Sequence, residues 1–423
     1  MAEITLEDFR AEVTTFFEAN APKKEEKTTD FVWGEGSDDV GLFEETDAER
    51  EALELKEAQA WRAKRFDAGL GWITGPPEFG GRDLTSAYDR VFGSVESRYE
   101  TPNQGFFGIG LGMVAPTINA HATQEVKEAY LKKMYRGDLV GCQLFSEPGA
   151  GSDLASMVTK AERDGDEWLI TGQKVWTSGA HYSDIGEIIC RTDVDLPKHA
   201  GLTGFVVDMK APGVDIRPLR QMTGGTNFNE VFFTDVRVPD NHRLGDVNQG
   251  WTVALTTLMN ERASIGAGGA GGGAGLASVA RMREMVRHFG LDQDPLIRQR
   301  LADVYIGFQV AKFNNQRALD KIKSGQLPGP EMSIAKLSLT NNMWNLANFM
   351  AEVLGPRLQA DTGEWGTYQW SQFLMGVPGM KVAGGTDEVM KNIVGERVLG
   401  LPKDAGIDSK TPFRELKVGT LES

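Results

Sequence analysis

The chain has 423 residues, of which 40% are hydrophobic and 25% are charged, an ordinary globular composition that excludes fibrous and wholly disordered classes. At roughly 150 residues per domain, this length indicates two or three domains. The 45 basic and 60 acidic residues give a net charge of −15, and no run of Lys and Arg stands out, which argues against nucleic acid as a partner.

The sequence carries no targeting or membrane signal. No stretch approaches 18 consecutive apolar residues, and residues 1–10 have neither an apolar signal core nor the Arg-rich character of a transit peptide. The two cysteines, Cys142 and Cys190, have no metal-ligand spacing to each other or to the five histidines. We therefore expect a soluble protein of a reducing cytoplasm with no membrane insertion, no metal site and no disulfide.

Residues 1–138 are predicted to form an N-terminal α-helical domain. Thr5 with Asp8 is typical of a capping box at a helix start. Residues 44–65 form a long, charge-rich helical stretch.

Residues 139–244 are predicted to form a middle β domain, because the pattern changes to short strand-like runs separated by turn residues. These runs are 167–171, 174–178, 204–208 and 230–234. A turn at 171–173 is expected to separate the first two. The pattern favours an antiparallel β-barrel or sandwich.

Residues 245–405 are predicted to form a C-terminal, four-helix-bundle-like α-helical domain, followed by a surface tail at 406–423. A glycine-rich run at 266–275 favours a place where backbones or a ligand approach closely. The expected fold class is therefore multidomain α+β, in the order helical, β, helical. The default site in such an arrangement is a cleft between domains.

Two motifs in the middle domain carry the strongest local signal. Residues 146–153 (SEPGAGSD) form a loop broken by Pro and Gly, whose exposed N–H groups and hydroxyls suit a phosphate or the edge of a heterocycle. Residues 172–178 (GQKVWTS) place Trp176 and Ser178 on one face of a strand, which suits a flat cofactor. From the residues alone, a tight turn beside a core aromatic explains the pattern equally well.

These two motifs, together with residues 384–388 (GGTDE) and 396–402 (ERVLGLP), resemble the acyl-CoA dehydrogenase family in order and spacing. The resemblance covers nearly the whole chain. It implies an FAD enzyme, usually a homotetramer built from dimers, that oxidises an acyl-CoA thioester to its 2,3-enoyl-CoA and passes electrons to an electron-transfer flavoprotein.

The resemblance also implies the flavin contacts. It assigns Trp176 and Ser178 to the isoalloxazine ring and its N5, and Phe145 and Ser146 to the pyrimidine edge. It assigns Gly151 and Ser152 to the pyrophosphate and the CoA arm of the substrate, and Thr386 and Glu388 to the adenosine half.

The catalytic base is expected on a helix. Many family members carry a glutamate where this chain has Gly384, which has no side chain to take a proton. Branches resembling isovaleryl-CoA and long-chain dehydrogenases place the base on the first helix after the β domain, where this chain has Glu261. With Ala254, Leu258 and Ile265, Glu261 follows helical spacing on an apolar stripe, and burial there would raise its pKa toward the range of a working base. A structural ion pair is the alternative.

The same resemblance implies two supporting roles. The N–H of Gly384 and a ribose hydroxyl of FAD would hold the thioester carbonyl. Arg262 would orient Glu261, although an ordinary ion pair is an equal alternative. The missing side chain at Gly384 leaves room for a branched or bulky acyl group.

The sequence departs from the family on the adenosine side. Relatives commonly hold the FAD adenosine across the dimer with Arg-x-x-Phe-Gly and Gln-x-x-Gly-Gly. The corresponding residues here are Arg287, Phe289, Glu352 and Gly355, and an acid thus replaces the amide. Because an acid repels a pyrophosphate, the chain could be one half of a heteromeric assembly. The alternatives in function are a flavin oxidase or monooxygenase on the same fold, and a non-catalytic partner subunit.

Overall fold

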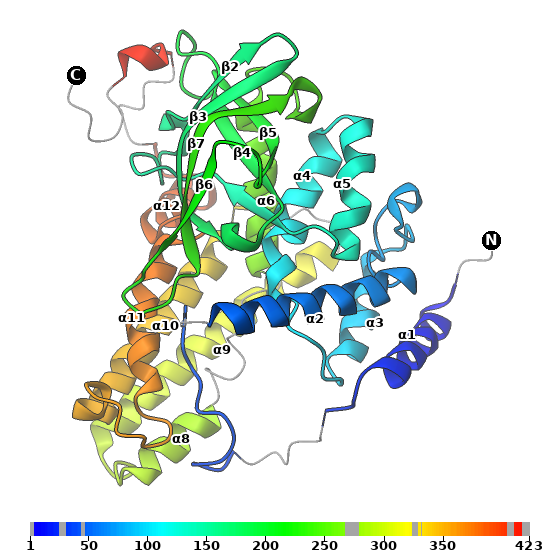
Figure 1. Cartoon of the computed structure of the whole chain (residues 1–423). Helices are drawn as coiled ribbons and strands as arrows, with labels where there is room; N and C mark the ends of the chain where they lie inside the picture. The colour runs from blue at the N-terminus through cyan, green and yellow to red at the C-terminus, as the bar shows by residue number, and fades with distance from the viewer. Residues whose placement is uncertain are drawn as a thin grey trace.

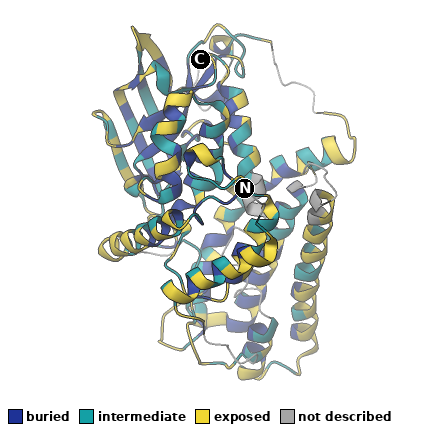
Figure 2. Ribbon diagram, turned by 90° about the vertical axis from the view of Figure 1, so that its right-hand side faces the viewer, coloured by how far each residue is buried: buried dark blue, intermediate teal, exposed yellow. Residues whose placement is uncertain are grey.

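The computed structural model describes residues 4–24, 31–43, 47–266, 279–323, 329–330, 332–403 and 410–416. Figure 1 shows the β-sheet at the top, with the N-terminal helices on one side and below it and the C-terminal helices beneath. Buried residues follow the sheet and the inward faces of the helices (Figure 2). The predicted order of helical, β and helical regions is confirmed.

The N-terminal region is helical, and its first helix begins as the sequence predicts. The Thr5 hydroxyl accepts a hydrogen bond from the Asp8 N–H at 3.1 Å, which confirms the cap. A π-helical turn, η3 (Gly110–Val114), leads directly into the fourth helix. The α-helices are α1 (Leu6–Asn20), α2 (Ala48–Asp67), α3 (Ser86–Glu96), α4 (Ala115–His121) and α5 (Gln124–Arg136).

The middle region is one mixed sheet in the order β6-β7-β3-β2-β4-β5-β8, with β1 paired to β4. The strands are β1 (Gly141–Leu144), β2 (Lys160–Asp164), β3 (Glu167–Ser178), β4 (Ile185–Arg191), β5 (Leu202–Asp208), β6 (Val214–Leu219), β7 (Phe228–Pro239) and β8 (Arg243–Leu244). The β1–β4 and β2–β4 pairs are parallel. The predicted antiparallel arrangement holds for the other strand pairs but is wrong for these two, because β1 and β2 both run in the same direction as β4.

The turn predicted at residues 171–173 is also wrong. β3 runs unbroken from Glu167 to Ser178, and its register against β7 shifts between Ile170 and Gly172. A Cβ at Gly172 would lie 2.5 Å from Thr159 Oγ1, so the glycine serves a close approach within a β-bulge.

The C-terminal helices pack around α10, which contacts α6, α9, α11 and α12. The described helices are α6 (Gly250–Gly266), α8 (Val279–His288), α9 (Pro295–Lys323), α10 (Met332–Leu354), α11 (Gln369–Val382) and α12 (Asp387–Ile393). Apart from its first residue, the predicted glycine-rich run lies outside the described residues.

Two segments cross between regions. Residues 31–43, which precede α2, run along the C-terminal helices (Figure 1), and Val40 lies in their core. Residues 410–416 dock on the β-sheet, where Phe413 is buried and the Arg191 guanidinium lies 3.7 Å from its ring centroid. The predicted surface tail is thus wrong for this stretch, because Phe413 gains apolar burial there.

Among the described residues, no helix combines the length and the apolar character needed to cross a membrane. Both cysteines are buried and free.

Candidate active site

The loop after β1 and the end of β3 meet through two hydrogen bonds. The Val175 N–H donates to the Ser146 carbonyl at 2.8 Å, and Lys174 Nζ donates to the Phe145 carbonyl at 3.1 Å. These bonds bring Phe145 and Ser146 beside the strand segment that carries Trp176. Residues separated by about 30 positions in sequence therefore form one local surface.

A buried ion pair holds this junction together. Lys174 Nζ lies 2.8 Å from Glu147 Oε1, and the two side chains are 0% and 3% exposed. Glu147 also accepts hydrogen bonds from the N–H groups of Val158 and Thr159. Burial alone would raise the pKa of Glu147, but Lys174 and these donors outweigh burial and lower its pKa below the ordinary value.

Trp176 is held outward by an unusual backbone. Its φ is +61°, at a register shift between Lys174 and Thr177, and its side chain is 60% exposed. Its ring meets Phe228 edge-on at 5.9 Å, and Phe228 in turn contacts Phe43 at 5.2 Å. A strained, exposed indole is costly to the fold by itself, so the arrangement indicates a surface for a flat ligand.

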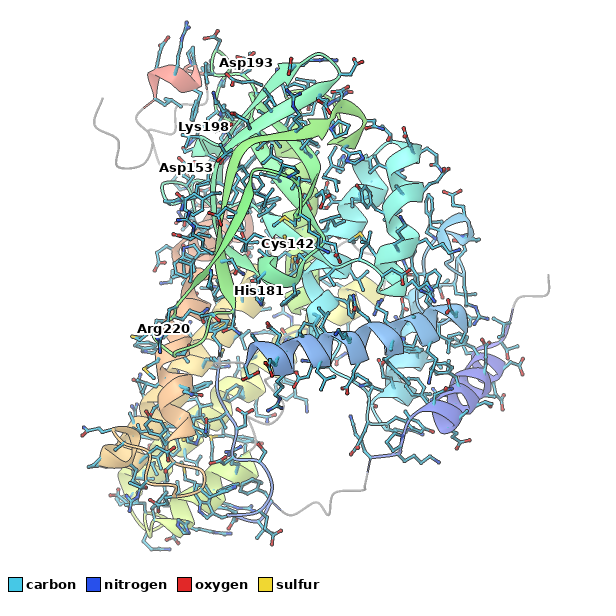
Figure 3. All side chains as sticks on the ribbon, in the orientation of Figure 1. Cys142, Asp153, His181, Asp193, Lys198 and Arg220 are labelled. Carbon is cyan, nitrogen blue, oxygen red and sulfur yellow. The ribbon has the colours of Figure 1, made fainter. Side chains whose placement is uncertain are left out.

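Gly151 and Ser152 lie on the exposed part of the same loop. The next residue, Asp153, anchors the loop because Lys198 Nζ donates to both of its carboxylate oxygens at 2.7 Å. Figure 3 shows the two side chains together at the edge of the sheet. The backbone of Gly151 and Ser152 thus stays at the surface between Glu147, which pairs with Lys174, and Asp153, which pairs with Lys198.

The turn at residues 384–387, leading into α12, is held by a helix cap and by side chains of α10. Gly384 and Gly385 have φ values of +66° and +87°, which favour glycine. Thr386 caps α12 by accepting from the Val389 N–H at 3.1 Å. Asp387 is buried, and burial alone would raise its pKa, but hydrogen bonds from α10 and from Lys381 lower it. The α10 donors are Lys336 at 2.8 Å and Thr340 at 2.9 Å.

Glu388 does not share this anchoring, because its side chain is exposed and lies 4.0 Å from Lys391. Glu261 lies on α6, half-buried. Ala254, one end of the predicted apolar stripe, is buried, and Leu258 packs against the core. The side chains of Arg262 and Ile265 lie outside the described residues. α6, which carries Glu261, and α12, which follows the Gly384 turn, both pack on α10.

The residues predicted for the adenosine side are engaged within the chain. Arg287 pairs with Glu284 at 2.8 Å, and Glu352 pairs with Arg300 at 3.3 Å. Gly355 begins a 3₁₀ turn with a φ of +51°.

Phe289, the fourth residue of that set, is also covered. It meets Trp33 edge-on at 5.9 Å and lies beneath the Arg357 guanidinium at 4.4 Å. Trp33 also stacks on His288 at 5.2 Å. Arg287 and Glu352 thus have partners within the chain while remaining exposed, and Phe289 is partly covered.

The sequence interpretation missed Glu187, which lies in the middle of β4 and is 0% exposed. Burial raises its pKa to about 8, although the hydroxyl of Thr257 partly offsets this. A single acid inside the apolar run 185–190 was the available signal. The sequence interpretation also gave no role to Lys174 and Glu147, because their pairing is a tertiary contact.

Family models of the three acyl-CoA dehydrogenase domains match this chain. The N-terminal domain model matches residues 40–138, the middle domain model residues 142–236 and the C-terminal domain model residues 248–399. The chain belongs to the acyl-CoA dehydrogenase family. It is an oxidoreductase of the CH–CH type, in a family that binds FAD.

Individual relatives agree. The chain is 37% identical over 358 residues to the acyl-CoA dehydrogenase IpdE1 of Mycobacterium tuberculosis, covering 84% of this chain and 91% of that one. A solved structure titled Tcur3481-Tcur3483 steroid ACAD matches at a TM-score of 0.68 and 26% identity, covering 94% of this chain and 98% of that one. The ChsE4-ChsE5 complex from Mycobacterium tuberculosis matches at 0.67 and 26%, covering 96% and 100%. The predicted family, fold class and enzyme class are confirmed.

Proposed function

We propose that this chain catalyses the α,β-desaturation of a branched or bulky acyl-CoA to its 2,3-enoyl-CoA. The observation that carries the proposal is the outward-held Trp176 beside the 145–152 loop, in a chain of this family. An exposed indole on strained backbone offers a flat apolar face, which fits a flavin ring.

The flavin would rest on the junction of the loop and β3. Trp176 would lie against its ring and Ser178 near N5, while Phe145 and Ser146 would meet the pyrimidine edge. We place Gly151 and Ser152 at the pyrophosphate, where exposed N–H groups suit an anion. When bound, FAD would supply the acceptor for the β-hydrogen, which leaves as hydride.

Glu261 is our proposed base. Its carboxylate would take the α-proton while the β-hydrogen leaves with its electron pair, so the α and β carbons become joined by a double bond. The Gly384 N–H would donate to the thioester carbonyl, where negative charge develops. Arg262 would orient Glu261. Electrons would then pass to an electron-transfer flavoprotein.

Two observations favour a bulky acyl group. Gly384 places no side chain in the turn beside the expected reacting carbons, and its left-handed backbone suits glycine. A relative of known structure is titled a steroid ACAD, at 26% identity over 94% of this chain. We therefore infer a branched or polycyclic acyl-CoA as the substrate class.

We further propose that the chain works in an oligomer with a second, different chain. The adenosine-side residues Arg287, Glu352 and Phe289 are engaged internally, which argues that this chain does not hold a partner's adenosine there. Apolar side chains on α9, Ile306, Val310 and Phe313, are exposed and would need cover. Two structural relatives bear titles that pair two names.

The test is the visible spectrum of the purified protein, followed by anaerobic addition of straight, branched and polycyclic acyl-CoAs. We expect flavin colour that only the branched or polycyclic thioesters bleach. Bleaching by straight chains alone would refute the substrate class. A yellow protein that no acyl-CoA bleaches would refute the desaturation.

The internally engaged adenosine side also favours the non-catalytic partner role as a second candidate. A colourless protein that acquires flavin only with another chain would support it. Oxygen uptake with substrate would instead identify an oxidase or monooxygenase.

A further inference from the structure

Glu187 is a buried carboxyl group that the proposed chemistry does not use. It lies at the middle of β4, and its side chain is 0% exposed. Its Oε1 lies 2.5 Å from Thr257 Oγ1, while its buried Oε2 has no hydrogen-bond partner in the described part of the chain. Burial raises the pKa of Glu187 to about 8, so the group is largely uncharged at neutral pH.

A line of hydroxyl groups continues from this carboxyl. Thr257 Oγ1 lies 2.9 Å from Thr117 Oγ1, which donates to the Met113 carbonyl at 2.9 Å. Both threonines are 0% exposed. Thr257 Oγ1 is the donor to Glu187 Oε1, and it also lies 3.3 Å from the Val253 carbonyl of its own helix.

This line joins the three regions of the molecule. Glu187 belongs to the middle sheet, Thr257 to α6 of the C-terminal helices and Thr117 to α4 of the N-terminal helices. A short directional bond specifies position more sharply than apolar contact does, so this line of hydrogen bonds can hold the three regions in register.

The same carboxyl adjoins the strand that leads into the 145–152 loop and the helix that carries Glu261. On β1, Gln143 is the parallel partner of Glu187, and it precedes Phe145 by two residues. On α6, Thr257 precedes Glu261 by four residues, which places both on one face of the helix. β4 and α6 also contact each other directly.

We propose, on the basis of the proposed function, that Glu187 is a positioning residue that sets the spacing between the 145–152 loop and the base Glu261. Its bond to Thr257 fixes α6 one turn before the base. Its place beside Gln143 fixes the strand that enters the loop. An uncharged acid makes this bond without placing a charge in the core.

Two other titratable groups on the elements around Glu187 already have partners of their own. His121, on α4, is engaged by Thr256 at 2.7 Å. Lys174, on β3, donates to the Ile189 carbonyl at 2.8 Å but is paired with Glu147. Glu261 lies one turn along α6 from Thr257. Deprotonation of Glu187 would leave a buried charge with one oxygen unpaired in the described part of the chain, so we expect alkaline pH to disturb this packing and slow the reaction.

The test compares four variants of the full-length protein: Glu187→Gln, Glu187→Leu, Thr257→Val and the control Thr256→Val. Glutamine keeps the shape and the hydrogen bond, whereas the leucine and valine variants remove the bond. Thr256 is the neighbouring α6 threonine, and its hydroxyl faces His121 instead. The measurements are flavin content and the rate of flavin reduction at saturating acyl-CoA, from pH 6 to about 9.5, a range that brackets the Glu187 titration.

We expect Glu187→Leu and Thr257→Val to keep their flavin but to reduce it about 10- to 100-fold more slowly, with KM little changed, since small displacements of a reacting group have effects of this size. Glu187→Gln should match the natural protein at pH 7 and lose the alkaline decline. Thr256→Val should keep both the rate and the decline.

Natural reduction rates in Glu187→Leu and Thr257→Val would overturn the positioning role while leaving the proposed function intact. Thr257→Val decides the matter if the leucine variant does not fold. A rate in Glu187→Gln as low as in Glu187→Leu would also overturn the proposal, because position would then not be what matters. If acyl-CoA reduces no flavin even in the natural protein, the proposed function fails and the positioning role fails with it.

Discussion

The flavin-ring side and the adenosine side of the expected cofactor site differ in where their side chains point. On the ring side, Trp176 is 60% exposed at a strained backbone position, above a buried ion pair that fixes the loop. On the adenosine side, Arg287 and Glu352 are paired within the chain, and Trp33 covers Phe289. The ring side thus presents an exposed aromatic face, whereas the charged side chains of the adenosine side already have partners within the chain.

This difference shows why a motif and its setting must be considered together. The ring-side motifs keep the family's pattern and hold Trp176 exposed, whereas the adenosine-side residues depart from that pattern and form ion pairs within the chain. Four experiments would break or sharpen the comparison.

The largest effect should come from the proposed base. Glu261→Gln removes the proton acceptor but keeps the shape, so flavin reduction by acyl-CoA should slow by about 10²- to 10⁴-fold. Stopped-flow bleaching under anaerobic conditions measures this rate. Flavin content should not change, and a rate within threefold of the natural one would exclude Glu261 as the base.

The next effect concerns the ion pair beneath the ring side. Lys174→Met leaves Glu147 buried without its partner, which should cost about 3–5 kcal/mol of unfolding free energy. Lys198→Met is the matched control, because Lys198 pairs with Asp153 of the same loop, whose side chain is 57% exposed. That change should cost less than about 1 kcal/mol. Denaturant titration compares the two, and equal losses would contradict the contrast.

The third prediction concerns pH and stability. An acid whose folded-state pKa is about 8, against an ordinary value of 4.5, binds more protons in the folded than in the unfolded chain between these values. Glu187 should therefore lower the unfolding free energy as pH rises from about 4.5 to 8, by a few kcal/mol.

Glu187→Gln should flatten that part of the stability curve, because glutamine does not titrate. Thermal melts at several pH values measure the difference. Parallel curves for the natural protein and the variant would show that Glu187 is ionised at neutral pH.

The smallest effect tests the two tryptophans. Trp176→Ala should weaken FAD binding by about 0.5–1.5 kcal/mol, or roughly 2- to 13-fold in Kd, as expected for loss of one aromatic contact. Trp33→Ala should leave the FAD Kd within about twofold and lower only the Tm. Fluorescence titration of the apoprotein with FAD measures both. Equal weakening by the two variants would place FAD on both surfaces and overturn the comparison.

Much of the fold was predictable because its signals are local. The cap at Thr5, the helical spacing around Ala254 and the strand runs in the middle domain each depend on neighbouring residues. The errors came where distant segments decided the outcome. Gly172 continues a strand because Thr159 packs against it, and Phe413 is buried because the sheet receives it.

The candidate site divides in the same way. The motifs at 146–153 and 172–178 are short stretches of sequence, and the structure brings Ser146 and Val175 of these motifs together. The apolar surroundings of Glu187 gave a hint in sequence, but its contact with Thr257 joins positions 70 residues apart.

The sequence by itself determined the family, the order of the helical and β regions and the position of the proposed base, because motif spacing and helical period are properties of nearby residues. Only the tertiary structure decided that Trp33 covers Phe289, that Lys174 and Glu147 form a buried pair, and that Glu187 meets Thr257. Each of these contacts depends on the path of the whole chain. Burial then sets the protonation of Glu187, because desolvation depends on every element packed around a group.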